Sequence, residues 1–191
     1  MLHRRLFLLV YGASGAAALI YEVTWTRLLA LEMGHGIAAA STVLAAFMGG
    51  LAMGSAAGGH FGGRLTSTGA LRTYAIIEIA IAALALLLPL ELAAVRPWLA
   101  SAYADGNPGV MFPLLRLVSN LFLVAVPAAA MGATFPIASR WVVRSASRAA
   151  SDAGWLYTVN TIGAALGAVL AGFLLLPALG LRRTMQVGVA L

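Results

Sequence analysis

Residues 14–29 read SGAAALIYEVTWTRLL, a hydrophobic stretch that carries two opposite charges, Glu22 and Arg27. The apolar run around it extends from residue 6 to residue 31, too long for the core of a signal peptide and long enough to cross a bilayer as a helix. An ionisable side chain inside a membrane is costly unless it is paired, hydrated or close to an interface. We therefore predict a transmembrane helix whose charged end has a structural or functional role.

The whole chain has the composition of an integral membrane protein. Hydrophobic residues make up 62% of it and charged residues 9%, with a mean hydropathy of +0.95, whereas soluble domains have about 25% charged residues. A chain of 191 residues has room for about six spans of roughly 20 residues each, and too little remains for a soluble domain. The absence of cysteine excludes disulfides and thiolate metal sites, and the three histidines share no helical spacing. We predict neither a metal nor a cofactor in this chain.

The fold class expected from these apolar runs is an all-α membrane protein, a polytopic helical bundle of five complete spans and a partial sixth. The predicted spans are residues 6–31, 37–62, 70–95, 111–143 and 153–176, with a partial span at 181–191. Because the last run is too short to cross a bilayer, we predict that the chain ends inside its sixth span and is a fragment of a longer protein. The prolines of the fourth span predict kinks, with a break in the sequence MGATFP at residues 131–136.

Small residues recur at every fourth position on the second and the fifth predicted span. The second span carries Ala46, Gly50, Gly54, Gly58 and Gly62, and the fifth carries Gly163, Gly167 and Ala171. In lipid, such stripes let two helix backbones approach closely and gain packing contacts. They predict helix–helix seams, with a glycine-lined ligand path as the alternative, and they also offer a surface for oligomer formation.

The arginines predict an orientation in the membrane. The chain has no lysine, and most of its arginines fall in three segments, at Arg4 and Arg5, at Arg64 and Arg72, and at Arg140, Arg144 and Arg148. By the positive-inside rule these segments face the cytoplasm, which predicts a bacterial inner-membrane protein with a cytoplasmic N-terminus. The last three arginines are spaced four apart on one helical face, which favours contact with anionic lipids. Nucleic-acid binding fits this charge pattern poorly.

Five polar residues inside the predicted spans form the candidate intramembrane site: Glu22, Glu78, Arg116, Asn120 and Asn160. At about 1.5 Å per residue, Glu22 and Arg116 lie at comparable depths, so we predict a structural pair there, with a solute site as the alternative. No arginine lies at the depth of Glu78, which predicts a carboxyl group that is protonated, bonded to Asn160 or part of a solute site. Both asparagines are typical of hydrogen bonds between helices.

Four ordered segments resemble the N-terminal membrane domain of bacterial membrane-bound spermidine-synthase-like proteins. They are SGAAALIYEVTWTRLLALEMG, STVLAAFMGGLAMGSAAGG, PAAAMGATFPIASR and LYTVNTIGAALGAVLAGFLLLPALG. The resemblance implies a major-facilitator-like half, followed in the full-length protein by a cytoplasmic aminopropyltransferase-type domain that binds decarboxylated S-adenosylmethionine and a polyamine. The chain contains no glycine-rich nucleotide loop and no acidic pair suited to that chemistry, so we predict no catalytic residue in it.

Three functions therefore compete. We predict a membrane anchor and scaffold for a synthase domain that is absent from this chain. The first alternative is a transporter-like half that moves a small, cationic solute such as a polyamine, for which Glu22 and Glu78 would supply carboxylates. The second alternative is a purely structural membrane subunit.

Overall fold

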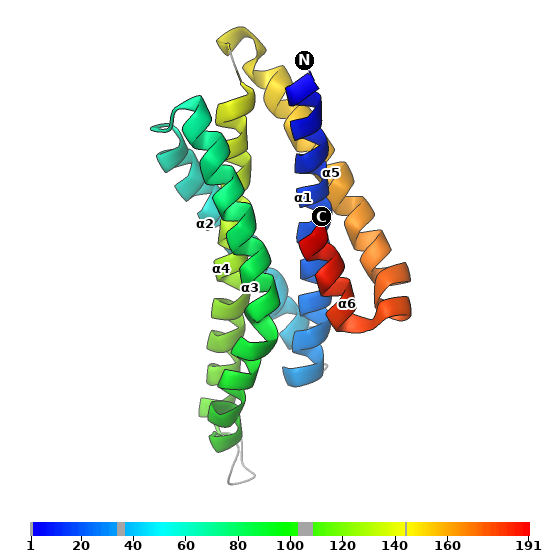
Figure 1. The fold of residues 1–191 in the computed structure, drawn as a ribbon. Coiled ribbons are helices and arrows are strands. Elements are labelled where there is room, and N and C mark those ends of the chain that lie inside the picture. Colours follow the sequence, from blue (N-terminus) through cyan, green and yellow to red (C-terminus); the bar gives the residue numbers. More distant parts are fainter. Residues whose placement is uncertain (1, 34–36, 103–108, 144) are drawn as a thin grey trace.

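Figure 1 shows the computed structural model of the chain, which describes residues 2–33, 37–102, 109–143 and 145–191. The described residues form helices and turns and contain no strand. Five helical segments are long and apolar enough to cross a membrane. The chain is therefore an all-helical protein with the composition of a membrane protein, as predicted.

The helices follow the apolar runs of the sequence closely. Their bounds are α1 Leu2–Met33, α2 Ile37–Gly62, α3 Ser67–Ser101, α4 Met111–Val142, the short 3-10 turn η1 Ala146–Arg148, α5 Ala149–Leu170, the π-helical turn η2 Ala171–Leu175 and α6 Leu176–Ala190. Thr66 ends the turn before α3, and its hydroxyl accepts a hydrogen bond from the Gly69 N–H, as a helix N-cap does. Helices α1 and α3 extend beyond their predicted spans at both ends, and α5 and α6 begin before theirs.

The predicted break at residues 131–136 is wrong, because α4 continues through it to Val142. Both internal prolines, Pro127 and Pro136, lie within the continuous helix. Contacts with α2 hold this segment in place: Gly132 abuts the backbone of Leu51, and the ring of Pro136 lies against Gly58. Neighbouring helices that pack this closely let a membrane helix tolerate the hydrogen bonds that proline removes.

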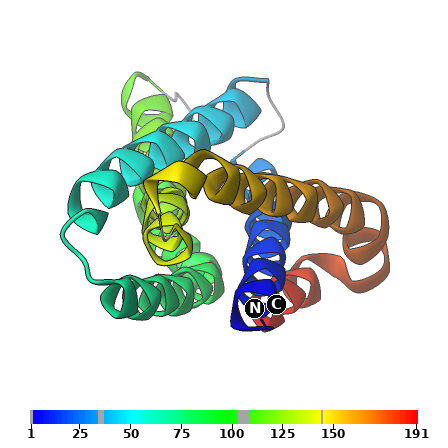
Figure 2. The same cartoon turned by 90° about the horizontal axis from the view of Figure 1, so that it is seen from above.

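The six helices form two groups of three. One group consists of α1, α5 and α6, and the other of α4, α2 and α3 (Figure 2). In chain order, α1, α2 and α3 of the first triplet correspond to α4, α5 and α6 of the second. The α1–α5 pair therefore corresponds to the α4–α2 pair, and the α1–α6 pair corresponds to the α4–α3 pair. All four of these pairs are in contact, so the packing follows the division of the chain into two triplets.

The glycine stripes lie in the closest seams of these two groups. On α2, Gly50, Gly54 and Gly58 face Ala125, Ala129 and Ala133 of α4. On α5, Gly163 faces Gly12 and Gly167 faces Ala16, both on α1. A side chain added at any of these glycines would meet the backbone of the opposite helix, so both stripes pack within one chain.

Gly180 reverses the chain direction between the two parts of α6. Its φ of 74° and ψ of 176° fall in a region that is essentially restricted to glycine. The residues after it return alongside α1, where Gly188 lies against the ring of Tyr21 (Figure 1). The sequence signal that ended the fifth span at residues 177–180 thus coincides with this turn.

The N-terminus, the turn between α2 and α3, and η1 lie at the same end of the bundle (Figure 1), and their segments are rich in arginine. We call this end the basic end; its described arginines are Arg4, Arg5, Arg64, Arg72, Arg140 and Arg148. Arg140 connects two of these segments, since its Nε donates a hydrogen bond to the Leu65 carbonyl oxygen over 3.1 Å. Arg144 lies outside the described residues.

Candidate functional site

A cavity of about 550 Å³ lies between the two helix groups, and all six α-helices contribute to its lining. Most of the lining is apolar. Its polar side chains are Tyr11, Ser14 and Tyr21 of α1, Ser55 of α2, Tyr74 and Glu78 of α3, Thr134 of α4, and Tyr157 and Asn160 of α5. The cavity is large enough for one small organic molecule, since such sites measure about 300–1,000 Å³.

One face of α1 packs against the neighbouring helices along the length of the bundle. Residues at alternating spacings of three and four fall on this face: Arg4, Phe7, Tyr11, Ser14, Ala18, Tyr21 and Trp25. Phe7, Tyr11, Tyr21 and Trp25 are all buried. Ser14 is the small hydroxyl residue in this aromatic row, so a gap opens beside it where the cavity lies.

Glu78 is the acidic side chain of this cavity. Its Oε1 accepts a hydrogen bond from the Ser14 hydroxyl over 2.6 Å, which joins α3 to α1 across the two helix groups. Tyr74 precedes Glu78 by one helical turn, so both side chains point to the same face of α3. The carboxyl group therefore lies inside the cavity, half-buried, with the Ser14 hydroxyl bonded to it and the Tyr74 hydroxyl beside it.

The Tyr74 hydroxyl is the least satisfied polar group in the cavity. Tyr74 is only 4% exposed, and its hydroxyl interacts electrostatically with Glu78. It makes no hydrogen bond of acceptable geometry to any atom that the structure describes. Since no such bond satisfies this buried hydroxyl fully, its oxygen can accept a hydrogen bond from a molecule that enters the cavity.

Aromatic rings close the cavity toward the basic end. Phe7 lies 4.6 Å from Trp141 and 5.3 Å from Tyr74 between ring centroids, and Tyr11 lies 5.9 Å from Tyr74. We call these four residues the aromatic cluster. Tyr11 and Tyr74 line the cavity, whereas Phe7 and Trp141 do not, so the cluster separates the cavity from the level of Arg4 on α1.

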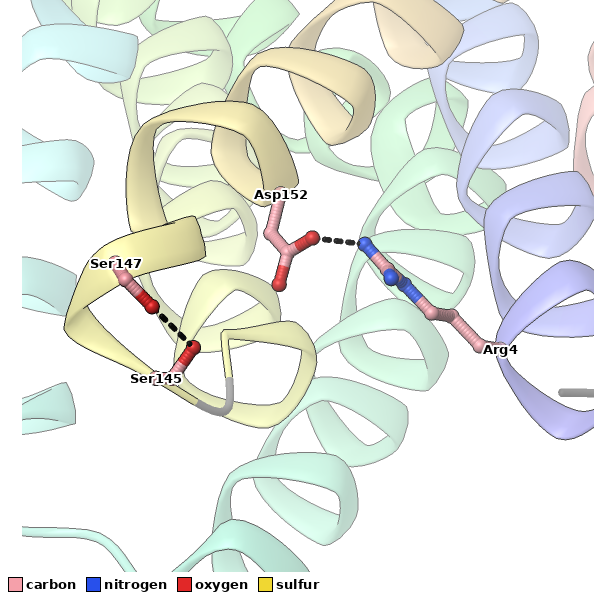
Figure 3. Close-up of polar contacts among 4 residues, drawn as sticks. All are labelled: Arg4, Ser145, Ser147 and Asp152. Carbon is pink, nitrogen blue, oxygen red and sulfur yellow. Dashed lines mark hydrogen bonds and ion pairs between the residues drawn. The ribbon is translucent and has the colours of Figure 1, made fainter.

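An ion pair between Arg4 and Asp152 lies beyond the aromatic cluster and connects α1 to α5 (Figure 3). The side chain of Asp152 is 8% exposed and that of Arg4 is 37% exposed. Asp152 lies in the first turn of α5, where the positive end of the helix dipole favours a carboxylate. In the adjacent turn the Ser145 and Ser147 hydroxyls approach each other over 3.3 Å (Figure 3).

The structure brings together two of the five predicted site residues. Glu78 and Asn160 line the cavity, whereas Glu22, Arg116 and Asn120 do not. The predicted Glu78–Asn160 hydrogen bond does not form: Glu78 bonds to Ser14, and the Asn160 amide oxygen packs beside Gly15.

The predicted pair of Glu22 and Arg116 does not form either. Glu22 has no hydrogen-bond or ion-pair partner among the described residues. Arg116 places its guanidinium 5.9 Å from the ring centroid of Phe112, on its own helix. Asn120 is buried in α4, and its Oδ1 has no hydrogen-bond partner in the described part of the chain. Equal depth did not bring Glu22 and Arg116 together, because α1 packs chiefly on α5 and α6.

Sequence reasoning missed Ser14 and Tyr74. The available signal was spacing: Tyr11 and Ser14 are three apart on one span, and Tyr74 and Glu78 are four apart on another. Each pair therefore shares a helix face, and a hydroxyl beside an acid on such a face favours a polar site.

Comparisons of the chain with protein-family models, with curated proteins and with solved structures give no match.

Proposed function

We propose that this chain is a transporter-like membrane half that binds a small cationic solute in the cavity around Glu78. The observation that carries the proposal is a carboxyl group inside a cavity between two helix groups, with one hydroxyl bonded to it and a second hydroxyl beside it. Ionisable groups at such depth are expensive and usually mark a solute or ion path. A carboxylate favours a cation, and the tyrosine rings around it favour the same charge.

The arrangement of the helices supports this proposal. A half of a major-facilitator-type transporter consists of two inverted triplets, and transporters in general bind solutes at interfaces between repeats. Here the α1–α5 and α4–α2 pairs correspond under exchange of the triplets, and α1 and α4 run in opposite directions (Figure 1). The cavity lies where the two groups meet. This arrangement supports the proposal of a major-facilitator-like half.

Replacing Glu78 with glutamine tests the proposal. We expect the affinity for a cationic amine to fall at least tenfold, because the substitution keeps the size of the side chain and removes its charge. The measurement is equilibrium binding of radiolabelled hexylamine and of radiolabelled spermidine to the full chain in nanodiscs. Glu91→Gln is the matched control, since Glu91 lies on the same helix and outside the cavity. If neither amine binds, or if both bind the Glu78→Gln chain unchanged, the proposal is wrong.

We propose an orientation with the basic end in the cytoplasm of a bacterial cell, as the positive-inside rule requires. The natural absence of cysteine permits a direct test with single cysteines at opposite ends, Ser147→Cys and Val110→Cys. Both positions are exposed, Val110 at 82%. A membrane-impermeant maleimide should label Val110→Cys in intact spheroplasts and Ser147→Cys only in inverted vesicles. The reverse pattern would place the N-terminus outside.

A second candidate function is that of a membrane anchor and scaffold for an aminopropyltransferase-type domain. The four sequence segments that resemble spermidine-synthase-like proteins favour it. The basic end would then face that domain, and its arginines would contact anionic lipids. The continuation of the gene decides between the candidates: a Rossmann-type domain downstream supports the anchor, and six further spans without such a domain support the transporter. Self-association stays a prediction, and it would need faces other than the glycine stripes, which are covered within the chain.

A further inference from the structure

The cavity offers a single negative charge to a bound molecule. Glu78 is the only acidic residue among the described side chains that line it. The acids Glu22, Glu91 and Asp152 lie elsewhere in the structure, and Asp152 is already paired with Arg4. One carboxylate neutralises one positive charge, so the site suits a monovalent cation.

The hydrogen-bond acceptors around Glu78 match a primary ammonium group, which has three N–H donors. Glu78 Oε1 accepts a hydrogen bond from Ser14, and the second carboxylate oxygen, Oε2, can accept one from a ligand. The Tyr74 oxygen is buried beside the carboxyl group and can also accept, and the Asn160 side chain reaches the cavity from α5. These three acceptors come from two sides of the cavity, and a quaternary ammonium group could donate to none of them.

The lining beyond this polar corner is mostly apolar and contains no further charged side chain among the described residues. Phe47 and Leu51 of α2, Ile81 of α3 and Met131 of α4 face the cavity. Such a surface favours a hydrocarbon substituent over a second ammonium group, which would lose most of its hydration without gaining a carboxylate. The aromatic faces of Tyr11 and Tyr21 can add cation–π attraction to the single charged head.

We infer that the cavity selects a singly charged primary ammonium with an apolar tail, and that it discriminates against polyamines. The inference rests on the proposed cation-binding function and narrows its substrate class. Glu78 matches the positive charge of the ammonium group. Oxygens of Glu78, Tyr74 and Asn160 can accept its three N–H donors, and the apolar part of the lining contacts the hydrocarbon tail.

Three ligands test this selectivity: hexylamine, N,N,N-trimethylhexylammonium and spermidine. Binding to the full chain in nanodiscs is taken as the difference between the wild-type chain and Glu78→Gln, which removes the contribution of partition into lipid. We expect hexylamine to bind at least tenfold more tightly than either of the other two ligands. Tyr74→Phe should weaken hexylamine binding threefold to tenfold and leave the trimethyl ligand unaffected, because only the hydroxyl is lost.

The possible outcomes separate the inference from the proposed function. Spermidine that binds as tightly as hexylamine, or more tightly, overturns the inference and leaves a cation site at Glu78 standing. Equal binding of hexylamine and its trimethyl analogue also overturns it, since the three acceptors would then have no role. If none of the three ligands distinguishes wild type from Glu78→Gln, both the inference and the proposed function fail. The comparison of ligands on the wild-type chain needs no variant in addition to Glu78→Gln, so it stands even where Tyr74→Phe folds poorly.

Discussion

Gly54→Val is expected to lower the free energy of unfolding by about 3 kcal/mol or more, at the upper end of the cost of overpacking a core. A Cβ at Gly54 would lie 2.7 Å from the Ala129 Cα and 2.5 Å from the Ala129 carbonyl carbon. Both atoms belong to the backbone of α4, so no side-chain rotation can relieve the collision. The two helices would have to separate, which would weaken the whole α2–α4 seam.

Gly49→Val is the matched control, because it makes the same change on the same helix. A Cβ at Gly49 meets nothing within 4 Å, so we expect an effect within about 0.5 kcal/mol. The measurement is reversible unfolding in mixed micelles, together with the monodisperse fraction after purification in mild detergent. Gly54→Ala should fall between the two variants. Equal stability of Gly54→Val and Gly49→Val would show that the seam does not depend on close backbone contact.

The sequence predicted the helices better than it predicted their neighbours. Long apolar runs define where a chain can cross a membrane, which is why the second span was predicted at the same residues as α2. A stripe such as Gly50, Gly54 and Gly58 also identifies which face of a helix packs closely. It does not identify the partner, because any helix with small residues at the same spacing fits. That α2 packs on α4, and α1 on α5, became visible only in the structure.

In the candidate site, too, the sequence identified individual residues better than it identified their neighbours. Glu78 was identifiable because a carboxylate in an apolar span is costly whatever surrounds it. Glu22 was matched with Arg116 by depth along the spans, but depth says nothing about direction around the helix. Tyr21 faces the cavity, and the next residue on an α-helix is turned by about 100° from it. A serine in an apolar helix can bond its hydroxyl to the backbone of its own helix, so it costs little free energy there. Its presence in the span therefore did not by itself indicate that Ser14 belongs to a site.

Arg4→Gln should lower the free energy of unfolding far more than Asp152→Asn does, although both substitutions remove the same ion pair. Without Arg4, the carboxylate of Asp152 remains 92% buried and unpaired, since its side chain is 8% exposed. We expect a loss of about 3 kcal/mol, at the lower limit for breaking a buried pair, because the N-terminus of α5 still favours a negative charge. Without Asp152, the Arg4 side chain is 37% exposed and can turn toward water, so the loss should be about 1 kcal/mol.

Exchanging the two charges distinguishes the contribution of the ion pair to stability from that of its surroundings. Arg4→Asp combined with Asp152→Arg restores an opposite-charge pair, but it places a cation at the N-terminus of α5, which the helix dipole disfavours by about 1 kcal/mol. The free energy of unfolding of the double variant should therefore be about 1 kcal/mol below that of wild type and well above that of Arg4→Gln. Arg5→Gln is the control, since Arg5 is exposed beside Arg4 and should change stability by less than about 0.5 kcal/mol. Equal losses in Arg4→Gln and Asp152→Asn would mean that burial of the carboxylate does not set the cost. In that case the ion pair would be a surface contact rather than the clamp that holds α1 and α5 together beyond the aromatic cluster.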